Sequence, residues 1–265
     1  MGGRGASSHR ATASGTATIR MFLLNAYGSK HADAVMAILK KAPDHVRSMW
    51  EDYASRFRAS SEVERSSGAY YSPRDDSVHL RIKQVSQGDA ISTPYSVLFH
   101  EYGHMTDFLI PRTNGQRPYF AYSELFQGIG SNGKPILRKG SSGGLLGRTA
   151  KEELEGHLSR IRRQNPNMTR DQAANRLISE AGSKYSYRAS SDISDMFEGA
   201  GIGKAFPLGV GHGLSYWQNR DNGKEIFAEI ISAEAAHPES LKAIRDYFPK
   251  TYQVYLDMMK VRKKK

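Results

Sequence analysis

Apolar residues recur at intervals of three and four positions along much of the chain, which is the period of amphipathic helices. This repeat predicts helices over residues 29–41, 43–58, 93–109, 149–164, 169–182, 192–198, 223–236, 238–246 and 249–262. Pro43, Pro238 and Pro249 begin three of them, at a position where a missing N–H costs no intrahelical hydrogen bond. The chain is therefore predicted to be dominated by helices.

A different period appears before the third of these helices. Residues 68–76 have the pattern of a short, tyrosine-rich strand followed by a turn. Val78, Leu80 and Ile82 then alternate with polar residues, as in a strand that is buried on one face. We therefore expect an α+β fold, mostly helical, with a small sheet before helix 93–109.

Two segments lack either period. Residues 1–18 are rich in Gly, Ser, Ala and Thr and are predicted to be a disordered leader, and residues 111–147 are glycine-rich and predicted to be loops. Residues 19–265 are expected to form one domain. The leader lacks the apolar stretch of a secretory signal, so the location stays open between association with a virion and delivery into a target cell.

The composition narrows the chemistry that the chain can carry. It has no cysteine, so any transition-metal site must use His, Asp or Glu. No apolar run reaches the roughly 18 residues that a membrane-spanning helix needs. The formal net charge of +11 is compatible with a nucleic-acid partner. The basic residues are scattered, however, apart from residues 261–265, and a solvated basic surface is the simpler interpretation.

The helix predicted at 93–109 contains the pattern His-Glu-x-x-His, formed by His100, Glu101 and His104. Residues i and i+4 share one helix face, so both imidazoles can bind one metal ion. A zinc ion there would lower the pKa of its bound water, and Glu101 could act as the general base toward that water. Random placement of the same residues would produce the pattern only about 0.02 times in such a chain. The flanking residues are apolar, so we expect a buried helix whose polar groups need a partner such as a metal.

A catalytic zinc site needs a third protein ligand and one open position. The residue six positions after His104 is Ile110, so the third His of the metzincin pattern is absent. Glu225 and Glu229 lie at i and i+4 on an otherwise apolar helix. We predict Glu225 as the third ligand and Glu229 as an acceptor for the N–H of a ligand histidine. An amphipathic helix with two solvated glutamates is the alternative.

Several residues between the two motifs are rival third ligands. They are Glu153, Glu155, His157, Asp192, Asp195 and Glu198. Their helices have the pattern of ordinary charged surface, so they rank below Glu225.

The segment His100-Glu101-Tyr102-Gly103-His104, followed far downstream by Glu225-Ile226-Phe227-Ala228-Glu229, resembles the anthrax lethal factor-type metallopeptidases, in the gluzincin branch of the zincins. The residues at 249–253 are similar to closing helices of that family, and the strands near 70–82 are similar to the strand that lines its substrate cleft. The resemblance covers about a third of the chain and implies a zincin-like fold with zinc on His100, His104 and Glu225.

The resemblance also implies roles for other residues. In that family a tyrosine shortly before the third ligand donates a hydrogen bond to the oxyanion, and Tyr216 is the nearest match here. Core packing of Tyr216 against Trp217 is the alternative. His212 is a second candidate for oxyanion stabilisation or substrate contact. Glu225 lies 121 residues after His104, farther than the family needs, so residues at about 111–211 are expected to be an insertion.

The expected function is that of a zinc-dependent metalloendopeptidase acting on a protein or peptide. The leader is similar to a segment of phage minor head proteins that precedes variable effector domains, which implies a phage-borne or secreted toxin with phage head proteins as partners. The strand at 77–83 is expected to pair with an extended substrate. The alternatives are a phage head-associated structural protein with a non-catalytic metal site and a basic nucleic-acid-binding protein.

Overall fold

The computed structural model describes residues 6–60, 62, 68–113, 115, 119–138, 143–203, 216–217 and 222–262, without the side chains of residues 6–14 and 188–192. Its helices are α1 (Ala6–Tyr27), α2 (Ser29–Lys41), α3 (Asp44–Tyr53), the 3-10 turn η1 (Ala54–Arg56), α4 (Ile82–Val85), α5 (Ser96–Thr113), α6 (Tyr122–Leu125), α7 (Leu145–Gln164), α8 (Arg170–Lys184), α9 (Tyr187–Ala200), α10 (Gly223–Ala236), α11 (Pro238–Tyr247) and α12 (Pro249–Val261). Its strands are β1 (Ala59–Ser60), β2 (Tyr70–Ser72), β3 (Ser77–His79), β4 (Phe126–Ile129) and β5 (Pro135–Leu137).

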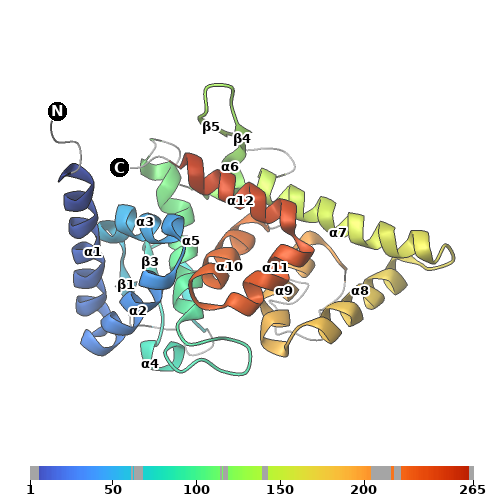
Figure 1. Ribbon diagram of the computed structural model, residues 1–265, viewed down its shortest axis with the longest axis horizontal. Helices are drawn as coiled ribbons and strands as arrows, with labels where there is room; N and C mark the ends of the chain where they lie inside the picture. The colour runs from blue at the N-terminus through green and yellow to red at the C-terminus, as the bar shows by residue number, and fades with distance from the viewer. Residues whose placement is uncertain are drawn as a thin grey trace.

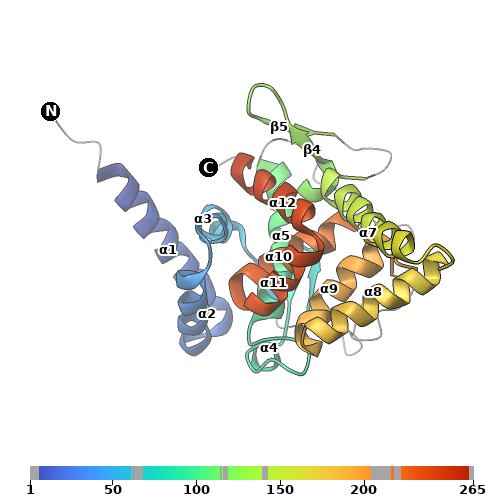
Figure 2. The same ribbon diagram turned by 45° about the vertical axis from the view of Figure 1, so that its right-hand side comes forward.

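Two helices, α5 and α10, lie side by side at the centre of the molecule (Figure 1). Helices α1, α2 and α3 and the sheet of β1, β2 and β3 flank α5, whereas α7, α8 and α9 lie on the other side of α10 (Figure 2). The β4–β5 hairpin projects from the body. The predicted α+β class, mostly helical with a small sheet, is confirmed.

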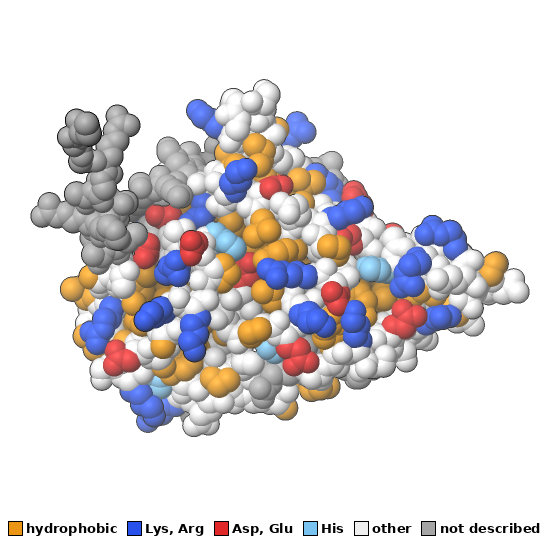
Figure 3. All heavy atoms as spheres, viewed as in Figure 1, with side chains coloured by type: hydrophobic (Ala, Val, Ile, Leu, Met, Phe, Trp, Pro, Cys, Tyr) orange, Lys and Arg blue, Asp and Glu red, His pale blue; other side chains and the backbone are white. Residues whose placement is uncertain are grey.

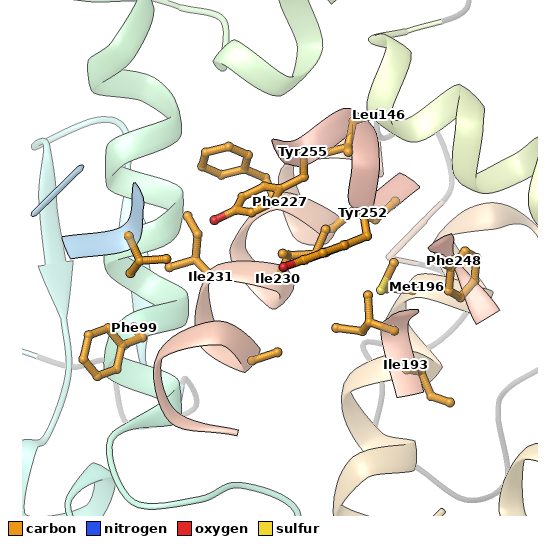
Figure 4. Packing of buried hydrophobic residues seen from close by; sticks show 14 of the residues in the cluster. Phe99, Leu146, Ile193, Met196, Phe227, Ile230, Ile231, Phe248, Tyr252 and Tyr255 are labelled. Atoms are coloured by element: carbon orange, nitrogen blue, oxygen red, sulfur yellow. The ribbon is translucent and has the colours of Figure 1, made fainter. Parts of the chain in front are cut away.

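The core surrounds α10 on every side. This helix has almost no polar face, because its residues from Gly223 to Glu234 are nearly all buried, as expected for a helix enclosed by others. Figure 4 shows the side chains that meet around it, from α5, α7, α9, α10, α12 and the residue before α12. They include Phe99, Leu146, Ile193, Met196, Phe227, Ile230, Ile231, Phe248, Tyr252 and Tyr255.

The segment between the two sequence motifs belongs to the same core. Leu146 and Leu154 of α7 and Phe197 of α9 are fully buried in the cluster that also holds Phe227 of α10. Residues 143–203 are therefore not a separate unit. Whether residues at about 111–211 are an insertion stays a prediction.

The periodicity located the later helices well. The bounds of α2, α10, α11 and α12 agree with prediction to within one residue. The helix predicted at 192–198 is longer, since α9 spans Tyr187–Ala200. The segment predicted as loops contains α6 and the β4–β5 hairpin, whose tight turn is formed by Gly133 with φ 70°.

The small sheet differs from its prediction. Its order is β1-β3-β2, with β3 parallel to β1 and antiparallel to β2. All of β3 is buried, His79 included, because His79 is held by hydrogen bonds with Asp75 (2.8 Å) and the carbonyl of Glu62 (2.6 Å). Ile82 begins α4 rather than ending the strand. Both edges of β3 are occupied, so it cannot pair with a substrate, and β1 and β2 are the outer strands of this sheet.

Helix α1 overlaps the segment predicted to be a disordered leader. It begins at Ala6 and therefore includes residues 6–18 of that segment. Ile19 and Leu23 anchor the helix in the core. Gly15 allows close approach to α3, because a Cβ at this position would lie 2.9 Å from Cβ of Glu51. Whether residues 1–18 are a disordered leader stays a prediction.

Candidate metal centre

Helix α5 presents the His-Glu-x-x-His residues on its pocket-facing side. It begins at Ser96, two residues after Pro94, because Tyr95 adopts a left-handed conformation with φ 66° that ends the preceding turn. Leu98 and Met105 on the helix are fully buried and fix its rotation. His100 and His104 then lie one turn apart, with ring centroids 4.6 Å from each other.

A close helix crossing brings the downstream glutamates to these histidines. Gly103 faces Ala228 of α10, and a Cβ on Gly103 would lie 3.0 Å from Cα of Ala228. The small residues let the two backbones approach, so that Glu225 and Glu229, three residues before and one after Ala228, reach α5. The structure thus brings together the predicted ligand pair and the predicted third ligand.

Three ligand atoms converge. Nε2 of His104 lies 3.0 Å from Nε2 of His100, and Oε2 of Glu225 lies 3.2 Å and 3.5 Å from these two atoms. Tetrahedral zinc with bonds of about 2.0–2.2 Å places its ligand atoms roughly 3.3–3.6 Å apart. The described residues thus offer a donor set of the correct type for a metal ion, with one separation inside this range and two that are 0.1–0.3 Å shorter.

Oε2 of Glu225 is fully buried, and within the described part of the chain it accepts no hydrogen bond, although buried carboxylate oxygens are almost always paired. It points at the two Nε2 atoms. Burial alone would raise the pKa of Glu225, but the neighbouring His104 and His100 hold this pKa well below its usual range. The negative carboxylate of Glu225 therefore stabilises a positive charge placed at the two imidazoles.

Glu229 contacts the opposite nitrogen of His100. Its Oε1 lies 3.4 Å from Nδ1 of His100, so it can orient the ring and favour a proton on Nδ1, which leaves Nε2 free to bind a metal. Burial would lower the pKa of His100, but the charge of Glu229 and the contact with Glu225 raise it well above the usual value. The position agrees with the predicted supporting role of Glu229.

Tyr216 contacts the third ligand directly. Its hydroxyl donates a hydrogen bond to Oε1 of Glu225. The oxyanion role of Tyr216 stays a prediction. The alternative, in which Tyr216 only packs against Trp217, does not account for its hydroxyl, which is hydrogen-bonded to Glu225. His212 lies outside the described residues.

These residues line a pocket of about 350 Å³. Its lining includes Glu101, the predicted base, beside His100, His104, Glu225 and Tyr216. The rest of the lining comes from β2 and its neighbouring residues, from Phe108 of α5 and from Lys224 of α10. Tyr70 and Tyr71 belong to the strands that the family resemblance placed along a substrate cleft, whereas sequence reasoning missed Ala69, Pro73, Phe108 and Lys224. Nothing in their local pattern marks them, because only the tertiary fold brings them to the site.

The rival ligands on α7 have other partners. Glu153 accepts hydrogen bonds from the N–H groups of Lys250 and Thr251 at the start of α12, both at 2.8 Å. Glu155 pairs with Arg170 at 2.6 Å. His157 contacts the carbonyl of Tyr247 at 2.7 Å.

The rivals on α9 are also separate from the three converging atoms. Glu198 accepts a hydrogen bond from Trp217, and Asp195 is buried but not part of the metal-binding group. The side chain of Asp192 is outside the described part of the chain.

Comparison of the chain with protein-family models, with curated proteins and with solved structures finds no match. The resemblance to lethal factor-type peptidases therefore rests on the two motifs. The site itself rests on the geometry described above.

Two further observations concern the whole surface. Lys and Arg side chains are spread over the face in Figure 3, interspersed with Asp and Glu, rather than gathered in one patch. Among the described residues, no helix combines the length and the apolar character that crossing a bilayer requires.

Proposed function

We propose that the protein is a zinc-dependent metalloendopeptidase of the gluzincin type, in which His100, His104 and Glu225 hold the metal. The convergence of the buried Oε2 of Glu225 with the Nε2 atoms of His100 and His104 carries this proposal. Two histidines and one carboxylate are the donor set of zinc peptidase sites. Zinc bound there would polarise a peptide carbonyl and acidify a water molecule.

The chain's own residues supply the remaining chemistry. Glu101 lines the same pocket as the ligands and is the candidate to accept the proton of the attacking water and pass it to the leaving amine. Tyr216 fixes the carboxylate of Glu225 through its hydroxyl. The hydroxyl has a single hydrogen, so donation toward a developing oxyanion, the role suggested by the family resemblance, would replace its hydrogen bond to Glu225.

The pocket wall favours an extended peptide as the substrate. Tyr70 and Tyr71 of the edge strand β2 line the pocket, while β3 pairs with β2 on its other side. An edge strand beside a catalytic centre can align a substrate chain by main-chain hydrogen bonds. The opening of the ligand group onto a pocket supports a catalytic rather than a purely structural metal, which would have a closed coordination shell.

The biological setting is proposed from the leader alone. Its similarity to a segment of phage head proteins supports a phage-borne or delivered toxin. The spread of basic side chains over the face in Figure 3 gives no specific support to a nucleic-acid-binding function.

The test is the zinc content of purified protein, measured beside cleavage of a mixed peptide pool. Wild type should hold about one zinc and cleave peptides, Glu101→Gln should keep zinc and lose cleavage, and Glu225→Ala should lose both. Glu155→Ala is the matched control, because Glu155 is a surface glutamate on α7 away from the pocket. A wild-type protein that binds no transition metal after metal-replete purification would contradict the proposal.

A further inference from the structure

Trp217 connects the site to helix α9. Its Nε1 donates a hydrogen bond to Oε2 of Glu198 at 3.2 Å. Its ring lies against Gly199, where a Cβ would be 2.9 Å from Cζ3 of the indole. The adjacent Tyr216 packs edge-on against Trp217, with ring centroids 5.1 Å apart, and donates its hydroxyl hydrogen to Glu225. A chain of contacts thus runs from α9 to the carboxylate of the proposed third ligand.

Helix α9 is a firm support for this chain of contacts. Glu198 is only 3% exposed, and a hydrogen bond to a buried carboxylate is among the stronger kinds in proteins. Ile193 and Phe197 anchor α9 in the core beside α10, as Figure 4 shows for Ile193. Gly199 leaves room for the indole ring, so the ring is held by a polar contact and a steric contact on neighbouring residues.

We propose that Glu198 and Gly199 are positioning residues, which act through Trp217 to hold the hydroxyl of Tyr216 at Glu225. The catalytic part of this inference rests on the proposed peptidase function. It gives a role in the site to α9, which lies in the segment expected to be an insertion. It also gives Glu198 a role that requires no metal contact.

A double-mutant cycle tests the coupling. Tyr216→Phe should lower kcat/KM about 10²-fold, as for loss of one aligned donor. Glu198→Ala should lower it about tenfold, mainly in kcat, since a misplaced group costs rate. In the Tyr216→Phe background, Glu198→Ala should cost less than about twofold, because the group that it positions is already absent. Glu198→Gln keeps an oxygen acceptor for the indole N–H and should restore most of the loss.

Tryptophan fluorescence gives a readout that does not depend on activity. The chain has two tryptophans, and Trp50 is fully buried in the core, so changes near Glu198 report on Trp217. Glu198→Ala should shift the emission to longer wavelength, whereas Glu155→Ala should not. Gly199→Ala is a second route to the same displacement if Glu198→Ala folds poorly, which thermal unfolding would detect.

The outcomes separate the two proposals. A folded, zinc-bound wild type that cleaves no peptide overturns the peptidase function and the catalytic role of Tyr216 with it. An active wild type in which the effects of Glu198→Ala and Tyr216→Phe multiply independently overturns the positioning role alone. Unchanged emission in both Glu198→Ala and Gly199→Ala also overturns it.

Discussion

Asp107 lies on α5 one turn beyond His104, fully buried, where it accepts hydrogen bonds from the N–H (2.8 Å) and the hydroxyl (2.5 Å) of Ser123. Burial raises the pKa of Asp107 from 3.8 to about 8, against the opposing effect of these hydrogen bonds. The carboxyl is therefore protonated in the folded protein at neutral pH and joins α5 to α6 as a neutral group.

This shift predicts a pH dependence of stability. Between pH 4 and pH 8 the folded chain keeps the proton on Asp107, whereas the unfolded chain releases it. The free energy of unfolding therefore falls as pH rises through this window, by about 1.4 kcal/mol per pH unit from this group. Asp107→Asn removes the titrating group and with it this slope; its Oδ1 can still accept from the N–H of Ser123, and its Nδ2 can donate to the hydroxyl of Ser123, which reverses that bond. Urea unfolding of both proteins from pH 5 to 8 measures the difference, and parallel curves would contradict the assignment.

The crossing of α5 and α10 depends on Gly103. A side chain at this position would meet the backbone of Ala228, which belongs to a buried helix and cannot move aside easily. Gly103→Ala is expected to destabilise the fold by about 1–3 kcal/mol through overpacking and to weaken zinc binding, because Glu225 moves away from the histidines.

Gly156 provides the matched control for this substitution. It lies on the exposed face of α7, and a Cβ at this position would have no neighbouring atom within 4 Å, so alanine there meets only solvent. Gly156→Ala should stabilise the helix by up to about 1 kcal/mol through helix propensity. Thermal unfolding and zinc titration measure the stability and the zinc affinity of both variants. If Gly103→Ala and Gly156→Ala change these quantities equally, the crossing of α5 and α10 tolerates a larger residue.

How far the sequence predicts an element depends on its length and its partners. Long helices such as α2, α10 and α12 repeat the apolar period often enough to be located. Strand β1 has two residues and pairs in parallel with β3, which lies about 19 residues later in the chain. No local sequence pattern therefore predicts this strand. The start of α5 was predicted at 93 rather than Ser96 because the left-handed Tyr95 was not foreseen.

The residues of the site also differ in how far the sequence predicts them. His100, Glu101 and His104 are close in sequence and were predicted from spacing, and Glu225 followed from a second local pattern. The link between Glu198 and Trp217 joins separate segments, so it could be seen only in the folded chain.

At the scale of the whole molecule, the proposed ligands join two central helices. A metal that binds only the folded arrangement stabilises it by mass action, by about 2.7 kcal/mol when its concentration is a hundred times the Kd. For a chain of this size, zinc should therefore raise Tm by roughly 5–10 °C. Glu101→Gln should show the same rise and Glu225→Ala none. A Tm that zinc and chelators leave unchanged in wild type would contradict the shared site.

The proposed metal ligands are far apart in the sequence, so the ribosome synthesises them at different times. His104 leaves the ribosome 121 residues before Glu225. At about 5–20 residues per second, roughly 6 to 24 seconds separate them. Throughout this interval the nascent chain carries the two histidines without the carboxylate. The proposed proteolytic activity would therefore arise late in translation, and chains interrupted before α10 would be harmless to the cell that makes them.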